Sequence, residues 1–295
     1  MESEKRKVAV VGALNVDLGG LAAGPLARGD SVPGTVSSCL GGVGWNIARD
    51  CALLGARTAF FSLLGRDGHE NAIRAEGARY GVDLAGCRWT EAPNNRYLYI
   101  CDERGDVTAA VNDMRLCERM GPELARQCLP ELNGFDAVAA DANLPAETLA
   151  ALGAGLTAPL AVDCVSAAKC GRLRAVLPRI HTLKANRLEA ETLTGQTSPE
   201  ACARALLRAG VKRAIISLGA EGILCGEKDG LFHMAAPHVP VADATGAGDA
   251  LTAALAVGLA EGLSLADCAA LGLAAAGVTL SQPGSVTEKL RTLAK

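Results

Sequence analysis

The distribution of apolar residues along the chain predicts strands that alternate with helices. Short continuous apolar runs, typical of strands buried on both faces of a parallel sheet, lie at residues 8–14, 58–64, 137–140, 160–163, 181–183 and 213–218. Helical spacing separates several of these runs, as in the segment from Asn46 to Leu54, which Gly55 ends. This alternation predicts an α/β fold in which helices flank both faces of a central, mostly parallel sheet.

Two segments depart from the alternation. In residues 96–112 a strand-like run is followed by a turn at 103–106 and a returning run, which predicts a β-hairpin. Residues 19–38 are rich in Gly, Pro and Ser. We predict that these parts of the chain, approximately residues 16–38 and 94–113, form a small β-sheet lid on a single domain that spans residues 1–295.

Composition narrows the range of partners. The 295 residues carry a net charge of −3 and only 3% aromatic residues, which argues against a nucleic-acid or membrane surface. The long apolar stretch at 250–280 is broken by Glu261, Gly262 and Asp267, so it predicts two packed helices rather than a membrane span. The eleven cysteines are scattered singly without a CxxC pair, and the charged N-terminus is unlike a signal peptide. We therefore expect reduced thiols in a cytoplasmic protein.

The most specific chemical motif is the octapeptide at residues 243–250, which precedes a long Ala- and Leu-rich run. Gly246, Ala247 and Gly248 lie where a helix begins, so their backbone N–H groups lack intrahelical partners and an anion can approach them closely. Asp249 follows in the first turn, where a carboxylate can accept the proton of a hydroxyl that attacks a phosphate. The motif predicts a small-molecule kinase. The alternative is a glycine-rich turn before a helix that begins with an acidic residue.

A second polar group follows the first predicted strand. Asn15 and Asp17 are two residues apart, so both can project from the carboxyl end of that strand, where open α/β sheets bind ligands. Gly41 and Gly42 allow a close backbone approach, and Asn46 can hydrogen-bond a hydroxyl. A carboxylate and amides in this arrangement suit the vicinal hydroxyls of a sugar. A simple turn at Asp17 and an ordinary helix start after Gly42 are the alternatives.

Three motifs follow one another along the chain: Gly12-Ala13-Leu14-Asn15-Val16-Asp17 with Gly41-Gly42 and Asn46, then Asn186-Arg187-Leu188-Glu189, then Asp243 to Asp249. In this order and spacing the chain resembles the ribokinase-like (PfkB) carbohydrate and nucleoside kinases. The resemblance covers nearly the whole chain. It implies a ribokinase-like fold and an ATP-dependent phosphotransferase that acts on an alcohol.

The resemblance also implies a nucleotide and ion site. The Asn186 and Glu189 pair would organise Mg²⁺ and its waters near the phosphates, with Glu189 acting through water. The residues implied at the nucleotide, besides Asn186, are Ser217, Gly219, Gly222 and Thr245. The backbone carbonyls of Asp243 and Thr245 match positions that hold a monovalent cation such as K⁺, although Ala244 replaces a common threonine.

The resemblance also bears on which substrate the protein phosphorylates. Val43 stands where many sugar kinases of the family have lysine, which weakens the match with ribokinases. Several stretches are instead similar to bacterial pseudouridine kinases, at residues 96–98, 105–114, 141–145, 162–169 and 181–191. We therefore expect phosphorylation of pseudouridine at its ribose 5′-hydroxyl. Candidate donors and acceptors for the uracil edge are Asn94, Asn95, Asn112, Asp113 and Asn143.

Two alternatives stay open at this point. The chain would then be a ribokinase-like kinase for another nucleoside or a sugar, or a catalytically silent ligand-binding protein on the same fold. The intact Asp249, Asn186 and Glu189 favour an enzyme. The apolar hairpin at 97–111 would suit contact between the lids of a homodimer, and equally a monomeric lid.

Overall fold

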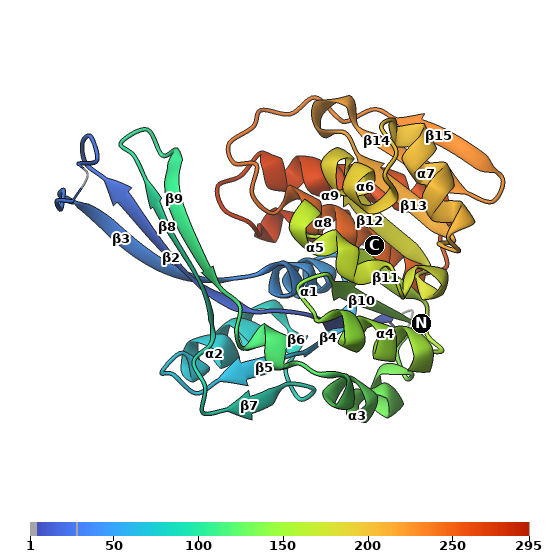
Figure 1. Ribbon diagram of the computed structural model, residues 1–295, viewed down its shortest axis with the longest axis horizontal. Coiled ribbons are helices and arrows are strands. Elements are labelled where there is room, and N and C mark those ends of the chain that lie inside the picture. The colour runs from blue at the N-terminus through green and yellow to red at the C-terminus, as the bar shows by residue number, and fades with distance from the viewer. Residues whose placement is uncertain (1–4, 28, 295) are drawn as a thin grey trace.

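A nine-stranded sheet forms the centre of the protein, whose computed structural model describes residues 5–27 and 29–294 (Figure 1). From one edge to the other its strands are β15 (Gly230–Met234), β14 (Ile223–Glu227), β13 (Arg213–Ser217), β12 (Thr182–Asn186), β11 (Leu160–Asp163), β10 (Ala137–Asp141), β1 (Lys7–Val11), β4 (Arg57–Phe61) and β6 (Val82–Asp83). The β13–β14 and β14–β15 pairs are antiparallel, and the other pairs are parallel. The predicted mostly parallel sheet is confirmed.

Two of the predicted strands are shorter than their apolar runs. The run at 8–14 continues beyond the end of β1 because the residues that connect β1 to β2 are also buried. A Cβ on Gly12 would lie 2.3 Å from the carboxylate of Asp141, so only glycine lets the chain pass this side chain. The run at 58–64 divides into β4 and β5 (Leu63–Gly65), which pairs with β7 (Arg88–Thr90). The apolar runs therefore predict buried residues, but they do not predict where these strands end.

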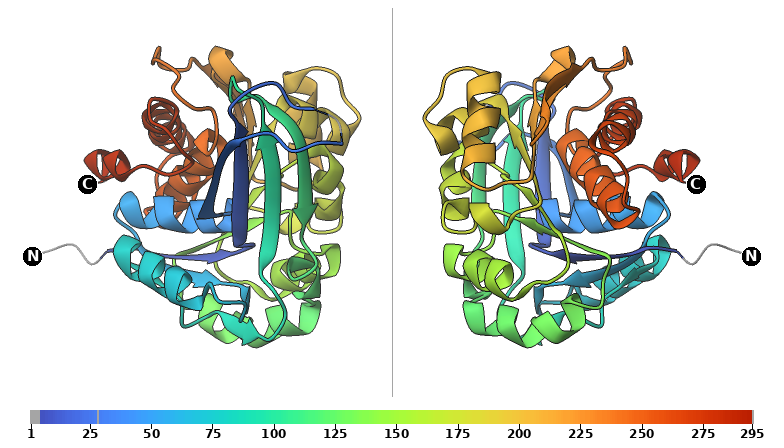
Figure 2. Two further views of the ribbon diagram at one scale, coloured as in Figure 1. Left: turned by 90° about the vertical axis from the view of Figure 1, so that its left-hand side faces the viewer. Right: turned by 90° about the vertical axis from the view of Figure 1, so that its right-hand side faces the viewer.

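Helices cover both faces of the sheet (Figure 2). One face packs against α1 (Val43–Leu53), α2 (Glu70–Tyr80), α8 (Ala247–Ala260) and α9 (Leu265–Leu280). The other packs against α3 (Pro122–Leu132), α4 (Ala146–Gly155), α5 (Ala167–Cys170), α6 (Arg187–Thr194) and α7 (Pro199–Arg208). The stretch at 250–280 forms the packed pair α8 and α9, as predicted. Among the residues that the structure describes, no helix is both long and apolar enough to cross a membrane.

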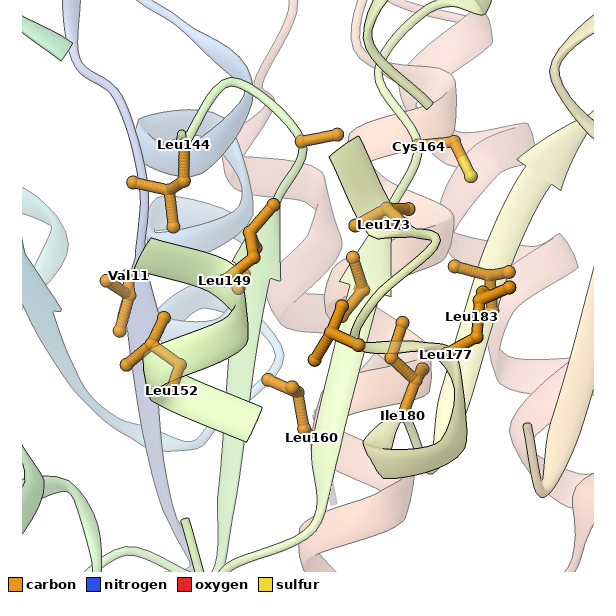
Figure 3. Close-up of a cluster of buried hydrophobic side chains, with 14 of the residues drawn as sticks. Val11, Leu144, Leu149, Leu152, Leu160, Cys164, Leu173, Leu177, Ile180 and Leu183 are labelled. Atoms are coloured by element: carbon orange, nitrogen blue, oxygen red, sulfur yellow. The ribbon is translucent and has the colours of Figure 1, made fainter. Parts of the chain in front are cut away.

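The larger hydrophobic cluster fixes the parallel strands against the second helical layer (Figure 3). Leu149 and Leu152 of α4 lie next to Val11 of β1 and Leu160 of β11 in this cluster, and all four are buried. Each such leucine contributes about 1.5–3 kcal/mol by leaving water. The layer holds the carboxyl ends of the strands in fixed positions, which is what a polar site at that edge requires.

A second sheet of four strands projects from the body of the molecule (Figure 1). Its order is β3 (Gly34–Gly41), β2 (Asn15–Ala22), β8 (Asn95–Cys101) and β9 (Val107–Asp113). We call it the lid sheet. It confirms the predicted small sheet built from two separate segments, although residue 28 of the first segment lies outside the described residues.

The register of the lid sheet decides which side chains share a face. Asp17 pairs with Cys39 on one side and with Tyr97 on the other, and Tyr97 pairs with Asn112. Because directly paired residues project to the same side of a sheet, these four residues lie on one face, which we call the Asp17 face. The opposite face, called the outer face, carries the exposed apolar residues Val36, Leu98, Ile100 and Val111.

Candidate active site

Most of the polar side chains predicted for the site meet at the carboxyl ends of the parallel strands, where the lid sheet joins the body. Asn15 begins β2, Asp141 ends β10 and Asn186 ends β12, while α1 and α8 direct their N-termini to the same region. Asn46 of α1 and Asp249 of α8 are 203 positions apart in sequence, yet the Asn46 amide donates to Asp249 Oδ2 at 2.7 Å. The fold therefore joins the first and third sequence motifs into one site.

Asp249 has the environment of a general base. Its side chain keeps some exposure to solvent, although protein atoms surround the carboxylate. Burial, reinforced by the nearby carboxylate of Asp163, raises the pKa of Asp249 to about 7, while the Asn46 amide and the charge of Lys184 oppose this rise. A base with a pKa near neutrality combines an adequate ionised fraction with proton affinity. Asp249 can thus accept a proton from a bound hydroxyl.

The start of α8 presents unpaired backbone donors beside that base. Gly246 precedes the helix in the left-handed region, with φ 82°, and a Cβ there would lie 2.0 Å from the Ser285 carbonyl oxygen. No side chain of the described residues caps this helix. The first N–H groups, from Ala247 and Gly248 onward, are therefore available to an anion, which the helix dipole also favours. Glycine at position 246 permits this backbone conformation and also lets an anion approach the N–H groups.

Lys184 stands beside these donors, although no motif in the sequence points to it. A Cβ on Gly248 would lie only 2.8 Å from Lys184 Nζ, so the ammonium group lies close to the helix N-terminus. Lys184 Nζ is 3.2 Å from Asp163 Oδ2, which also accepts from Thr252 Oγ1 at 2.6 Å. Although burial alone would lower it, Asp163, Glu189 and Asp249 raise the pKa of Lys184. A cation and free N–H groups together form a site for phosphate oxygens.

Asn15 and Asp17 carry buried oxygen atoms without partners. Neither Asn15 Oδ1 nor Asp17 Oδ1 has a hydrogen-bond partner among the described residues. A Cβ on Gly41 would lie 2.1 Å from Asp17 Oδ2. Gly42 has a φ of 97°, and a Cβ there would lie too close to the Ala13 carbonyl oxygen. Burial raises the pKa of Asp17 to about 6, with Arg49 opposing the rise. Buried acceptors are normally paired, so these two oxygens fit the hydroxyl donors of a ligand.

Asn186 and Glu189 share one helical turn, as the N-x-x-E motif predicts. Asn186 Oδ1 accepts from the Glu189 N–H at 2.9 Å, and Glu189 accepts from the Asn186 N–H and amide at 2.7 and 2.8 Å. This capping box holds the carboxylate of Glu189 in one orientation. Mg²⁺ usually keeps several waters and binds through one or two carboxylates plus phosphates, and a fixed carboxylate fits that mode. In the described part of the chain no group of three His, Cys, Asp or Glu side chains could enclose a metal.

The remaining residues expected at the nucleotide lie at the end of β13 and before α8. Ser217 Oγ donates weakly to the Ala185 carbonyl at 3.5 Å, and Gly219, at φ 64°, has open space beside it. Gly222, at φ 103°, is instead required by a turn, because a Cβ there would lie 2.1 Å from the Met234 carbonyl oxygen.

The loop before α8 is closed by Asp243. Its carboxylate accepts from the Thr245 N–H at 2.8 Å and from the Gly284 N–H at 3.2 Å. Although partial burial acts against it, these hydrogen bonds lower the pKa of Asp243. The side chain therefore shapes the loop, which is compatible with a cation held by backbone carbonyls.

The structure separates the candidate base-reading residues. Asn112 lies on the Asp17 face, but Asp113 pairs with Arg96 in the register and projects to the outer face, where it binds Arg115 at 2.6 Å. The period of two along β9 therefore places Asp113 on the side opposite Asp17, which does not favour its predicted contact with substrate. Asn143 remains near the site, at the end of β10, where its Oδ1 accepts from Lys169 Nζ at 2.6 Å.

Asn94 and Asn95 also have structural roles. The Asn94 amide joins Gly65 and Asp67, with bonds between 2.6 and 3.0 Å. The Asn95 amide donates to the Leu14 carbonyl at 3.0 Å and accepts from the Cys117 N–H at 2.9 Å. Both side chains are buried and hydrogen-bonded within the protein, which favours a structural role over recognition of a base.

Two tyrosines on the Asp17 face offer the aromatic surface that the prediction lacked. The rings of Tyr97 and Tyr99 lie 5.5 Å apart with planes tilted by 31°. Tyr99 covers Gly19, where a Cβ would lie 2.6 Å from the ring. These are two of only three tyrosines in the chain. Their spacing of two residues on a strand was the sequence signal, because it places both rings on one side.

Comparisons with known proteins agree with this geometry. Residues 5–292 match the protein family described as "pfkB family carbohydrate kinase". The chain is 34% identical over 285 residues to the uncharacterized sugar kinase YeiI of Escherichia coli, covering 94% of this chain and 79% of the relative. It is also 34% identical over 272 residues to the pseudouridine kinase of Escherichia coli, covering 90% and 87%.

The fold is also similar to that of a solved ribokinase structure. The structure of ribokinase from Thermotoga maritima superposes with a TM-score of 0.88 at 22% identity and covers 97% of each chain. The ribokinase-like fold predicted from the motifs is confirmed, and the sheet order, the motifs and the comparisons lead to one classification. The chain belongs to the pfkB family of carbohydrate kinases, which comprises ribokinase-like sugar and nucleoside kinases.

Proposed function

We propose that this protein is an ATP-dependent kinase that phosphorylates the ribose 5′-hydroxyl of pseudouridine to give pseudouridine 5′-phosphate. One observation carries the reaction type. A carboxylate with a pKa of about 7, Asp249, lies in the first turn of a helix whose free N–H groups adjoin the buried cation Lys184. A base next to an anion site is what the attack of an alcohol on a phosphoryl group needs.

The residues divide the work of phosphoryl transfer. Asn15 and Asp17 bind the ribose hydroxyls through their unpartnered oxygens, and Gly41 and Gly42 let the sugar approach the backbone. Asp249 accepts the proton of the 5′-hydroxyl as its oxygen attacks the terminal phosphoryl group. The N–H groups from Gly246 to Gly248 stabilise the negative charge that develops on that group, which contributes most where water is excluded.

The nucleotide and the ions lie on the other side of the transferring group in this proposal. Asn186, Ser217, Gly219 and Thr245 border the ATP site, and Lys184 pairs with its phosphates. Mg²⁺, held through water by Glu189, would neutralise phosphate charge. K⁺ bound by the carbonyls of Asp243 and Thr245 would stabilise the loop before α8.

The lid sheet favours a nucleoside over a free sugar. Along β2, Asp17 is followed on the same face by Gly19, about 6.6 Å further from the body at a strand rise of about 3.3 Å per residue. A ribose bound at Asp17 with its 5′ end at Asp249 would direct its base along this strand. The base then meets the rings of Tyr97 and Tyr99. Stacking on such rings is worth about 1–3 kcal/mol per base in single-stranded nucleic-acid complexes.

Pseudouridine and a sugar remain the two candidate substrates that the relatives support, because the pseudouridine kinase and the sugar kinase are equally similar to this chain. The test is kcat/KM for pseudouridine, uridine and ribose at matched ATP, Mg²⁺ and K⁺. We expect the order pseudouridine, uridine, ribose. Pseudouridine has a free N1–H that uridine lacks, and a site that pairs with this donor rejects uridine. Preference for ribose would contradict the nucleoside proposal, and no turnover with any substrate would favour a silent binding protein.

We propose further that the outer face of the lid sheet contacts a second copy of the chain. Val36 is 84% exposed and Val111 is 65% exposed, and Leu98 and Ile100 extend the same apolar face. Sedimentation at several concentrations tests this dimer.

The eleven cysteines are all free, which supports the cytoplasm as the proposed location.

A further inference from the structure

A chain of hydrogen bonds runs from α2 through α1 to Asp249. Glu76 Oε1 accepts from Trp45 Nε1 at 3.0 Å and from the guanidinium of Arg49. Arg49 Nη2 donates to Asn46 Oδ1 at 2.5 Å, and Asn46 Nδ2 donates to Asp249 Oδ2 at 2.7 Å. Among the described residues, the hydrogen-bonded route from Arg49 to the proposed base runs through Asn46.

Arg49 is held in place on several sides. It is 6% exposed, and its guanidinium lies over the rings of Trp45 and Tyr80, at 5.7 and 5.5 Å from their centres. Cation–π contacts and the ion pair with Glu76 fix one rotamer of a side chain that is otherwise flexible. Asn46 is three residues before Arg49 on α1, so both side chains share a helix face. The guanidinium is thus a rigid donor behind the Asn46 amide.

A rigid donor determines how an asparagine amide points. The oxygen and the NH₂ group of Asn46 exchange places when the side chain rotates by half a turn. Arg49 and the Ser285 hydroxyl, at 3.4 Å, both donate to Asn46 Oδ1. In the reversed orientation the NH₂ group would face the guanidinium, and the amide oxygen would face the carboxylate of Asp249. Both contacts would be unfavourable, so Arg49 favours the orientation in which Asn46 donates to Asp249.

We propose that Arg49 is a positioning residue for phosphoryl transfer, which holds the Asn46 amide so that it donates to Asp249. The inference rests on the proposed role of Asp249 as the base. Donation to Oδ2 fixes the plane of the carboxylate and directs its other oxygen toward the hydroxyl. Small errors in such an orientation are costly, because phosphoryl transfer depends on alignment.

Other charged groups surround Asp249: Asp163 of β11, Lys184 of β12, Asp141 of β10 and Asp50 of α1. Arg49 also opposes the burial that raises the pKa of Asp50, so an effect of Arg49 through Asp50 would persist in an Asn46→Ala background. Arg49 also lies near Asp17 and opposes the burial that raises the pKa of that carboxyl. An effect through Asp17 would change the KM for the ribose-bearing substrate, whereas an effect through Asn46 changes kcat. The routes can be separated.

The first test is Arg49→Met, which keeps most of the stem and removes the donors. We expect kcat to fall about 10- to 100-fold, the range for a misplaced catalytic group. The acid limb of the kcat profile should move to higher pH, because a reversed amide favours protonated Asp249. The matched control is Arg79→Met: Arg79 is exposed and lies 5.1 Å from the centre of the same Tyr80 ring, without contact to Asn46. Its kcat and pH profile should match those of the wild type.

The second test is a double-mutant cycle. If Arg49 acts through Asn46, Arg49→Met lowers kcat less than twofold in an Asn46→Ala background. An equal loss in both backgrounds, or wild-type kcat in Arg49→Met, would overturn the inference. Should Arg49→Met fail to fold, Glu76→Gln weakens the same anchor and must lower kcat in the same direction, and an unchanged kcat would overturn it too. Wild-type turnover by Asp249→Asn would instead overturn the proposed base, and this result is read independently of Arg49.

Discussion

The carboxyl ends of the nine-stranded sheet and the lid sheet border the same ligand region but are built in opposite ways. At the carboxyl ends, charged side chains are buried and paired: Lys184 with Asp163, and Glu189 with Asn186. In the lid sheet, the strands have open faces, and apolar side chains such as Val36 are exposed. The first region holds fixed charges in a dry environment, and the second presents surfaces that a ligand or a partner can cover.

This difference indicates how the two regions divide the function. Burying a charged group costs several kcal/mol unless it is paired, so a cluster such as Asp163, Lys184 and Asp249 persists where it has a chemical use. Such groups suit reaction steps, which need fixed electrostatics. Exposed aromatic and apolar faces suit recognition. Variants of the carboxyl-end cluster should therefore change kcat, stability or the KM for ATP, and variants of the lid sheet should change the KM for the nucleoside.

The largest expected effect belongs to Asp249→Asn. The amide keeps the shape and loses the proton acceptor, so kcat should fall about 10²–10⁴-fold, the usual contribution of a general base. The KM for the nucleoside should change little, because the proposed site for the ribose hydroxyls is at Asp17. Steady-state kinetics measures both quantities. Turnover near that of the wild type would remove Asp249 from this role.

Gly248→Val tests the anion site beside the base. The new Cβ would lie 2.8 Å from Lys184 Nζ and block the approach of a phosphate to the N–H groups. Loss of one donor to the transition state costs about 10²–10³-fold in kcat. The control is Gly121→Val, just before α3, where a new Cβ would have no neighbouring atom of the described residues within 4 Å. An active Gly248→Val enzyme would mean that the phosphates bind elsewhere.

Lys184→Met removes one member of the buried ion pair. Asp163 would then keep Thr252 Oγ1 but lose its cation, and breaking such a pair destabilises a protein by about 3–5 kcal/mol. The KM for ATP should rise as well, because the proposed phosphate site loses its buried cation. Urea unfolding and kinetics at varied ATP measure the two effects. A rise in KM without any loss of stability would indicate that Asp163 is satisfied by other groups.

Tyr99→Ser has the smallest expected effect and acts on the lid sheet alone. The KM for pseudouridine should rise by a factor equivalent to about 1–3 kcal/mol, the value of a base–aromatic contact. The kcat/KM for ribose should stay unchanged, because ribose has no base. An equal loss with both substrates would show that Tyr99 supports the sheet rather than the nucleoside.

The sequence predicted the site best where one short motif contains the chemistry. Asp249 and the glycines before it are contiguous, and their place at a helix start followed from local pattern alone. The Asn46–Asp249 hydrogen bond crosses 203 positions and required the fold. Lys184 was missed because it lies within an apolar strand, where a charged residue gives no periodic signal. The spacing of Asn46 and Arg49 was visible, but their common partner was not.

The lid sheet was predicted as an element but not in its register. The hairpin at 96–112 followed from its alternation, yet the face of each residue depends on how four strands pair. A shift by one position moves a side chain to the other face, which is why Asn112 shares the face of Asp17 and Asp113 does not. Asn94 and Asn95 were assigned to the base by residue type alone, although such amides also bind loops together.

The most direct test of the central claim is the pH dependence of kcat/KM for pseudouridine at saturating ATP and Mg²⁺. At saturating ATP this ratio reports the ionisation of the enzyme–ATP complex before pseudouridine binds. Because Asp249 must be ionised to accept a proton, activity should fall as the pH decreases through about 7. Asp17, whose pKa is about 6, should add a second, lower fall that Asp17→Asn removes. A profile that is flat between about pH 5 and pH 8 would contradict the account. So would a fall in activity near pH 7 that persists in Asp249→Asn.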